Sequence, residues 1–476
     1  MKMKKLSLLA LPLLCLTSCG GGGGDPKKTH VEFWGWGDEV EVGIFRSIVN
    51  KYNSTNNDDI YVDFSTQPAS GYASKLESAL RNAKAPEIFF VGDADIKKYV
   101  TNNWLENITT RVSTSETINL DDMWQSGIDR YRYNKDTHTS KSTDPLFCLP
   151  KDLGPSVIYY NKDAFEKVGI TIVSKKASEC EEDERHGFYE KGGKKYFNNK
   201  ISMTKEEELT LSKLLTKEYN PASRTNFGFY TEWWFNYVWS IGGDCLKVGD
   251  DNYYHWALGD TAKTTCTYNG SPVSTRDVFQ HFIDLSVNER VMPKPSSVPS
   301  SDKAAFFEAE EFAMMVGIRA QVAEFREYCN FNWDVAPLSH YEGGTVEGHS
   351  GSMGYGISPF SSDVKKDAAF KFMEYMTGPD GQKELSETGF SIPNQKELAR
   401  EIVSKETLPA NAEIFLDYVE TQRGGDWTYL PDGNWITIWS GDLNGDVLNG
   451  LMTLDRFFEK HQAETDETLR LYGKVL

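Results

Sequence analysis

The chain has 476 residues and a formal net charge of −19 at pH 7, with 70 acidic against 51 basic side chains. Such an acidic chain repels phosphate groups, which excludes nucleic acid and anionic membrane surfaces as partners. Aromatic residues make up 13% of the sequence and charged residues 25%, a composition typical of a folded globular protein rather than a disordered one. At about 150 residues per domain, the length predicts about two to four domains.

The amino terminus has the pattern of a secretory signal. Three lysines precede an apolar run from Leu6 to Leu16, and small residues then lead to Cys19. The run is about half of the roughly 20 residues that a membrane-spanning helix needs, so we expect residues 1–18 to be removed as a signal peptide. The glycines at 20–24 and the polar residues that follow predict a flexible tether over residues 19–29.

Strands and helices are predicted to alternate along the first part of the mature chain. Residues 31–37 predict a strand that ends in a glycine loop, and residues 44–52 follow with helical apolar spacing. A second strand is predicted at 60–64, a helix at 72–83 and a third strand at 87–91. This alternation predicts an α/β fold with a parallel sheet and with ligand-facing loops at the carboxyl ends of the strands.

Three stretches rich in proline, serine or glycine interrupt this pattern, at residues 149–155, 291–301 and 343–356. Because such stretches end helices and strands, each is a candidate connection between two lobes. A further strand is predicted at 156–161, directly after the first stretch. Residues 171–205 are densely charged and predict a solvated surface insertion without chemistry of its own.

The cysteines that follow Cys19 are odd in number, so they cannot all pair. Cys245 and Cys266 flank a polar stretch and could close a loop in an oxidising compartment, or could both stay free. No CxxC motif and no Cys/His cluster occurs in the sequence, so neither a metal site nor a cofactor is predicted.

Short segments in a fixed order carry a resemblance to a known family. They are residues 31–36, 85–91, 149–163, 313–317, 333–338, 354–358 and 368–382. This order resembles the family 1 extracellular solute-binding proteins, the maltose-binding-protein-like carriers of ABC importers, over nearly all of the mature chain. Leu16-Thr17-Ser18-Cys19 in turn resembles the lipobox at which bacterial lipoproteins are acylated.

The resemblance implies a two-lobed fold of the periplasmic-binding-protein type II, in which each lobe is a sheet flanked by helices and the chain crosses three times. It places lobe one at residues 30–150 and 302–354, and lobe two at residues 155–300 and 357–476. It also implies a monomer outside the cytoplasm, anchored to the membrane by a lipid on Cys19. This lipoprotein would bind a mono- or oligosaccharide between its lobes and deliver it to the permease subunits of an ABC importer.

In lobe one the resemblance places ligand contacts after the first and third strands. Trp36 and Asp38 follow the first strand, with ordinary loop packing as the alternative role. Asp93 and Asp95 follow the third strand, where capping of the next helix is the alternative. Tyr355 lies at the third crossing and is a further candidate.

In lobe two, Glu232, Trp233 and Trp234 lie in a segment that resembles the cleft-facing segment of the family. Neighbouring side chains on a helix point about 100° apart, so one of the two tryptophans is expected to face the cleft. Arg319 stands where many family members have a ligand-stacking tryptophan, which favours a polar or acidic sugar. Two more tryptophans lie in the region of the last aromatic platform of the family, with core packing as the alternative: Trp435 and Trp439.

An enzyme and a surface adhesin are the competing classes of function. A glycoside hydrolase needs two carboxylates across a cleft, and the sequence cannot pair them among its 70 acidic residues. Residues 348–352 approach the nucleophile elbow G-x-S-x-G but end in serine. An adhesin would share the anchor and lack the ordered segments. The sequence therefore favours a carrier without catalytic residues.

Overall fold

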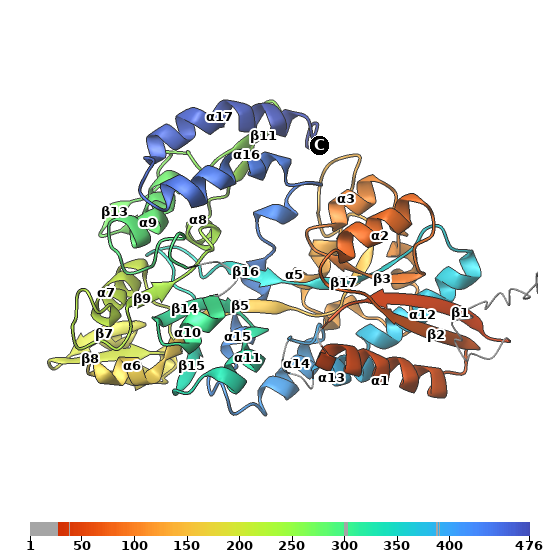
Figure 1. Ribbon diagram of the computed structural model, residues 1–476, viewed down its shortest axis with the longest axis horizontal. Helices are drawn as coiled ribbons and strands as arrows, with labels where there is room; N and C mark the ends of the chain where they lie inside the picture. Colours follow the sequence, from red (N-terminus) through yellow and green to blue (C-terminus); the bar gives the residue numbers. More distant parts are fainter. Residues whose placement is uncertain (1–26, 38, 299–302, 387–388, 390) are drawn as a thin grey trace, which may run out of the picture.

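The computed structural model describes residues 27–37, 39–298, 303–386, 389 and 391–476. The predicted signal peptide, the predicted acylation site Cys19 and the candidate Asp38 lie outside the described residues. Among the described residues, no helix combines the length and the apolar character needed to cross a membrane. The chain folds into two α/β lobes that lie side by side (Figure 1).

The first lobe is built on a five-stranded sheet in the order β2-β1-β3-β17-β4. Strands β1, β2 and β3 are parallel, and β17 runs antiparallel to both β3 and β4. The strands are β1 (Thr29–Gly35), β2 (Ile60–Thr66), β3 (Ile88–Gly92), β4 (Cys148–Pro150) and β17 (Met353–Ile357). The helices are α1 (Glu39–Thr55), α2 (Tyr72–Arg81), α3 (Ile96–Thr101), α4 (Thr109–Ser113), α5 (Gln125–Ile128), α12 (Asp363–Thr377) and α13 (Pro379–Ser386).

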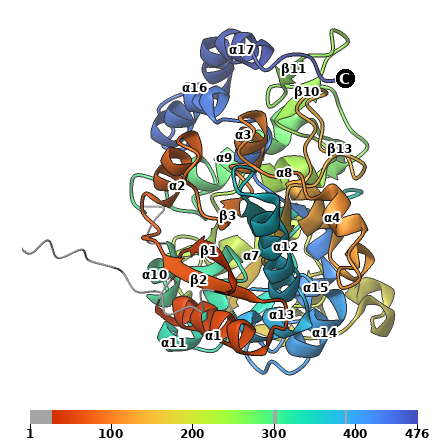
Figure 2. The same ribbon diagram turned by 90° about the vertical axis from the view of Figure 1, so that its right-hand side faces the viewer.

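The periodicity of the sequence explains these elements. Four of the five residues of β3 are buried, as expected of a central strand that is covered on both faces. Helix α2 buries Tyr72, Leu76 and Leu80, which recur every four residues and form one apolar stripe. Figure 2 shows α2 and α3 on one side of β1 and β2, and α1 on the other side. All the strands and helices predicted between residues 31 and 91 are thereby confirmed.

The second lobe is built on a sheet in the order β18-β16-β5-β14-β9, with β15 paired to β5. Strand β5 runs antiparallel to β14, β15 and β16, whereas β14 is parallel to β9 and β16 is parallel to β18. The strands are β5 (Gly154–Asn161), β9 (Phe227–Tyr230), β14 (Phe312–Ile318), β15 (Trp333–Ala336), β16 (Gly348–Gly351) and β18 (Gln422–Arg423).

Helices and small sheets surround this second sheet. The helices are α6 (Lys162–Lys167), α7 (Lys205–Leu215), α8 (Phe235–Ser240), α9 (Thr275–Val287), α10 (Lys303–Glu308), α11 (Gln321–Tyr328), α14 (Lys396–Val403), α15 (Ile414–Asp417), α16 (Asn434–Asp442) and α17 (Leu454–Arg470). The predicted charged insertion holds a three-stranded sheet of β6 (Ile170–Val173), β8 (Lys194–Asn198) and β7 (Phe188–Lys191). Two hairpins pair β10 (Leu246–Val248) with β11 (Tyr254–Trp256) and β12 (Thr267–Tyr268) with β13 (Ser271–Pro272).

The chain passes between the two sheets from β4 to β5, from β16 to β17, and again after α13.

The expected lobe boundaries are wrong in two places. Strands β14, β15 and β16 lie in the second sheet, so most of residues 302–354 belongs to lobe two, and α12 and α13 pack in the core of lobe one. Leu285 before the proline-rich stretch at 291–301 and Phe307 after it both pack in the core of lobe two, so the chain does not cross between lobes there. Proline and serine mark a break in secondary structure, but they do not say which sheet the chain joins next.

Arg130 joins lobe one to strands β16 and β18 of the second sheet. Its guanidinium donates to the backbone carbonyl of Ser126 at 3.0 Å in its own lobe and forms an ion pair with Asp93 at 3.3 Å. It also donates to the carbonyls of Ser350 in β16 and Gln422 in β18, the latter at 3.2 Å. The Arg130 side chain is buried, so it links lobe one to the second sheet without access to bulk water.

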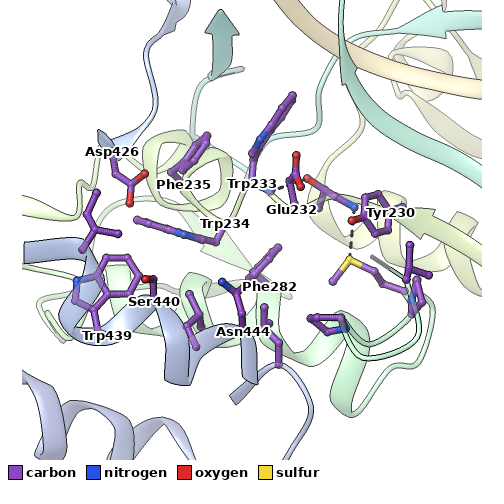
Figure 3. A pocket seen from close by; sticks show the side chains of 18 of the residues that line it. Tyr230, Glu232, Trp233, Trp234, Phe235, Phe282, Asp426, Trp439, Ser440 and Asn444 are labelled. Carbon is purple, nitrogen blue, oxygen red and sulfur yellow. Dashed lines mark hydrogen bonds between the residues drawn. The ribbon is translucent and has the colours of Figure 1, made fainter. Parts of the chain in front are cut away.

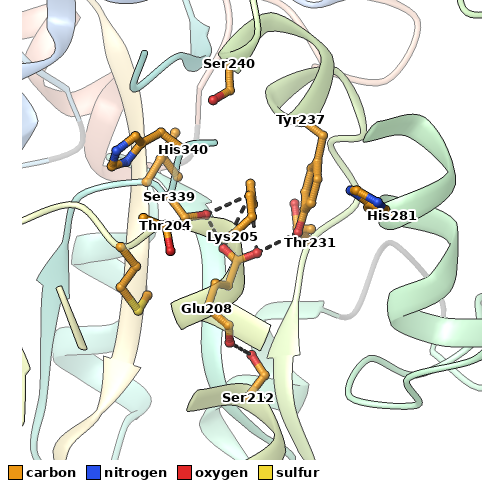
Figure 4. A network of polar contacts seen from close by, with 12 residues as sticks. Thr204, Lys205, Glu208, Ser212, Thr231, Tyr237, Ser240, His281, Ser339 and His340 are labelled. Atoms are coloured by element: carbon orange, nitrogen blue, oxygen red, sulfur yellow. Dashed lines mark hydrogen bonds and ion pairs between the residues drawn. The ribbon is translucent and has the colours of Figure 1, made fainter. Parts of the chain in front are cut away.

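A buried ion pair lies in the core of lobe two, between α7 and α8 (Figure 4). The Lys205 ammonium lies 3.3 Å from the Glu208 carboxylate and 3.4 Å from the centre of the Tyr237 ring. Tyr237 donates to Glu208 at 2.7 Å, and Ser339 accepts from Lys205 at 2.7 Å. Burial lowers the pKa of Lys205, and Glu208 opposes that shift.

The possible disulfide is not formed. Cys245 and Cys266 are both buried free thiols in this structure. The segment between them is held by the β10–β11 hairpin and by backbone hydrogen bonds, among them one from Ala257 to the Cys245 carbonyl at 2.7 Å. Local hydrogen bonding therefore closes the loop that the sequence suggested a disulfide would close.

Candidate functional site

A cavity of about 520 Å³ opens in lobe two at the carboxyl end of β9 (Figure 3). Its walls come from four segments that lie far apart in the sequence. The first follows β9, the second follows α9, the third is a 3-10 turn at Asp426–Thr428, and the fourth is α16 with the π-turn behind it. The side chains that matter below are Glu232, Trp233, Trp234, Phe235, Asp426, Trp427, Trp439, Ser440 and Asn444.

Aromatic rings form one side of this cavity. The Trp234 ring meets Trp439 edge-on at 6.0 Å and Phe235 at 5.5 Å between ring centres. Phe235 in turn meets Trp427 at 5.8 Å. Trp427 is 36% exposed, whereas the other three rings are buried. Trp427 therefore presents the free aromatic surface at this site, and the other rings support it and line the cavity.

An ion pair lies at one end of the cavity, where the Glu232 carboxylate contacts the Lys303 ammonium. The Lys303 nitrogen lies 5.4 Å from the centre of the Trp233 ring, within the range of a cation–π interaction. Burial lowers the pKa of Lys303 to about 8. The charge of Glu232 is thus balanced by a protein cation.

Asp426 is the second carboxyl group in the lining. It is 5% exposed, and it comes from the same turn as Trp427. The backbone N–H groups of Trp427 and of Asp426 itself favour its charged form and so oppose a rise of its pKa. Burial raises the pKa of Asp426 to about 7, and the like charge of Asp244 adds to this shift. The acid therefore takes up a proton far more readily than an exposed aspartate does.

Contacts of Tyr429 and His349 fix the turn that carries Asp426 and Trp427. Tyr429 donates to Asp244 at 2.7 Å and accepts from the Trp239 indole at 3.0 Å. His349 of β16 lies edge-on to Trp427 at 5.1 Å and to Trp233 at 4.9 Å. Burial lowers the pKa of His349 to about 3, so its imidazole is neutral at physiological pH. These contacts place the exposed tryptophan by packing rather than by charge.

Trp233 connects the pocket to the other lobe. It also lines a second cavity of about 560 Å³, to which Val40 contributes from α1 in lobe one. Lys303 and Tyr328 line this second cavity from lobe two. The site therefore extends from the interior of lobe two to the space between the lobes.

The structure brings four of the predicted site residues together in one cavity: Glu232, Trp233, Trp234 and Trp439. Both adjacent tryptophans line it, although the sequence predicted that one would face the cleft. Asp426 and Trp427 were missed. The sequence signal that could have found them is the glycine pair Gly424-Gly425, which marks a turn directly before an acid and a tryptophan.

Three predicted residues lie in the protein interior instead. The Arg319 guanidinium is paired with Glu406 and lies 4.9 Å from the centre of the Phe415 ring, so it does not reach the pocket. Tyr355 is buried in the core of lobe one, and Trp435 is fully buried behind Trp439. The argument for a polar or acidic sugar that rested on Arg319 therefore does not hold in this structure.

Three more predicted residues lie in lobe one, outside the lining of both cavities. Trp36 is half-buried at the end of β1 and packs against the first core. Asp93 is paired with Arg130, and burial raises the pKa of Asp93 to about 6. Asp95 precedes α3, but its side chain makes no capping hydrogen bond there, so the expected alternative role is not realised.

No group of three or more metal-ligating side chains occurs in the part of the chain that the structure describes. Comparison with known protein families matches residues 47–413 to the model of the bacterial extracellular solute-binding proteins. The comparison with curated proteins finds no match.

Solved structures with the same fold include three carriers. The sugar-binding protein MalE of Xanthomonas citri has a TM-score of 0.69 and 18% identity, and the match covers 93% of this chain and 98% of that one. A substrate-binding protein of Listeria monocytogenes in complex with cycloalternan has a TM-score of 0.67, 18% identity and coverages of 93% and 99%. A solute-binding protein of Thermotoga lettingae bound to α-D-tagatose has a TM-score of 0.65, 17% identity and coverages of 93% and 100%.

These matches confirm the predicted two-lobed α/β fold. The family match spans well over half of the chain, and the family comprises extracellular binding proteins, in agreement with the predicted location outside the cytoplasm. The chain belongs to the bacterial extracellular solute-binding protein family.

Proposed function

We propose that this protein is a monomeric carrier, anchored outside the cytoplasm, that holds a carbohydrate in the lobe-two pocket and delivers it to the permease subunits of an ABC importer. The observation that carries the proposal is the pocket itself, in which tryptophan rings and a few polar groups converge. Aromatic faces pack against the C–H faces of a sugar ring, and carboxylates, hydroxyls and amides bond to its hydroxyl groups. The proteins of the same fold solved with cycloalternan and α-D-tagatose support this assignment.

A thermal-shift screen against a panel of mono- and oligosaccharides tests the proposal. A ligand present at about 100 times its dissociation constant adds about 2.7 kcal/mol to the free energy of unfolding, which raises the melting temperature measurably. We expect one class of sugar to stabilise the protein without being turned over. Release of a smaller sugar from the panel would point to an enzyme, and a panel without any stabilising sugar would contradict the carbohydrate assignment.

The anchor is tested separately. We propose that Cys19 is acylated, because it ends a signal sequence of lipobox type and precedes a run of glycines. The Cys19→Ser variant is expected to bind sugar normally and to move from the membrane fraction to the soluble fraction. Mass spectrometry of the mature native protein should find acyl chains on Cys19, and a mature chain that lacks them would contradict the anchor.

A further inference from the structure

The pocket has an unbalanced negative charge. Among the described lining residues there is no lysine, arginine or histidine, and there are two carboxylates. Glu232 is paired with Lys303 at the end of the cavity. No cationic side chain contacts Asp426 within the described part of the chain, where the charged group that acts on it is the like charge of Asp244. A ligand that fills the pocket therefore meets one buried acid whose charge the protein does not balance.

Asp426 is placed where a bound ligand would contact its unbalanced carboxylate. Only 5% of Asp426 is exposed. Figure 3 shows its carboxylate directed into the cavity toward Trp234. An unpaired carboxylate in such a place either takes a proton or gains a counter-cation. Burial raises the pKa of Asp426 to about 7, so below that pH it is mostly protonated. A cationic ligand offers the alternative.

The surrounding side chains fit a cationic group attached to a sugar ring. Figure 3 shows Trp234 and Phe235 beside the Asp426 carboxylate, and Trp427 lines the same cavity. Aromatic faces attract an ammonium ion most strongly where water is excluded. Farther along the lining, Ser440 and Asn444 supply neutral hydrogen-bonding groups of the kind that hold hydroxyls. A sugar carrying phosphate or carboxylate would instead add a second negative charge beside Asp426.

We propose that the sugar held in this pocket carries a protonated amine, and that Asp426 forms the ion pair that selects it. This inference rests on the proposed function, because it names the class of carbohydrate for the same pocket. At a pH below the pKa of Asp426, binding converts a carboxylic acid and an ammonium ion into a carboxylate–ammonium pair. The proton that leaves Asp426 goes to the buffer, so binding should release close to one proton per site.

The test is a calorimetric comparison of three matched ligands. They are the di- and trisaccharides of β-1,4-linked glucosamine, their N-acetylated counterparts, and the corresponding glucose oligomers, which share a backbone and differ in the group at carbon 2. We use the mature protein at about one pH unit below the pKa of Asp426, in buffers of different ionisation enthalpy. The amine is expected to bind at least about tenfold more tightly than the two neutral forms, with release of a proton.

Two variants identify the group responsible. In the Asp426→Asn variant the amine should bind no more tightly than the neutral oligomers, and binding should release no proton. Asp432→Asn removes the same charge from an exposed position in the same segment, outside the lining, and should leave the preference for the amine and the proton release unchanged.

Each other outcome has a defined meaning. A neutral sugar that binds as tightly as any amine, or an amine that binds without proton release, overturns the inference and leaves the carrier function intact. Failure of every sugar in the wider panel to bind overturns the carrier function itself, and the inference with it.

Discussion

At the scale of single residues, the exposure of each tryptophan separates ligand contacts from core packing. Trp427 is 36% exposed beside the cavity, whereas Trp435 is fully buried. Trp427→Ala should therefore weaken sugar binding and lower the free energy of unfolding by less than the truncation of a fully buried tryptophan does. Trp435→Ala should leave a cavity and cost about 3–5 kcal/mol of that free energy. Calorimetry and denaturant melts on both variants check this. Equal losses of stability in the two variants would contradict the assignment of Trp427.

Asp426 makes a second prediction, for the pH dependence of stability in the absence of ligand. Folding raises the pKa of this acid from 3.8 to about 7, so the folded state keeps a proton that the unfolded state releases. The contribution of Asp426 to stability is therefore full below about pH 4 and is lost as the pH rises toward 7. Asp426→Asn, which cannot ionise, should be more stable than the native protein at pH 8 by up to about 4 kcal/mol, and by much less at pH 5.

Urea unfolding of both proteins at the two pH values measures this difference. The control is Asp432→Asn, since its exposed carboxyl lies in the same segment. If the gap between Asp426→Asn and the native protein were the same at both pH values, burial of an ionisable Asp426 would be ruled out as its cause.

At the scale of secondary-structure elements, the Lys205–Glu208 pair links α7 to α8 and to the segment that follows β15. Glu208→Gln should cost about 3–5 kcal/mol, because it leaves the buried Lys205 ammonium without its counter-charge. The matched control is Glu401→Gln on α14, which breaks an exposed pair with Lys405 beyond the end of that helix and should cost about 0.5 kcal/mol or less. Denaturant melts distinguish the two costs. A small loss in Glu208→Gln would mean that Lys205 sheds its proton when its partner is neutral.

At the scale of the whole molecule, the chain crosses between the two lobes three times, and Arg130 joins lobe one to the second sheet. Trp233 lines both the lobe-two pocket and the cavity to which lobe one contributes. A ligand that contacts both lobes binds the closed state more tightly and shifts the population toward it, by no more than this difference in affinity.

Small-angle scattering tests this closure. The radius of gyration should fall when a stabilising sugar is added to saturation, and it should stay constant with a sugar that gives no thermal shift. An unchanged profile at saturation would mean that the ligand is held by lobe two alone.

The local parts of the fold were predictable from the sequence. Apolar spacing is a property of neighbouring residues, and it located β1, α1, β2, α2, β3 and β5. The same holds for Glu232, Trp233 and Trp234, because three consecutive residues after a strand end at the same place in space. Signals of this kind need no knowledge of what the segment packs against.

Tertiary structure alone decided the remaining features. Strand β14 belongs to the second sheet because it pairs with β5 and β9. The sequence of the strand itself does not indicate which strands it pairs with. Arg319 meets Glu406, a residue 87 positions away, and so it leaves the pocket it was expected to serve. Asp426 and Trp427 reach the same pocket from nearly 200 positions beyond Trp233. Contacts between distant segments depend on the whole packed chain, whereas apolar periodicity and charge can be read from the sequence itself.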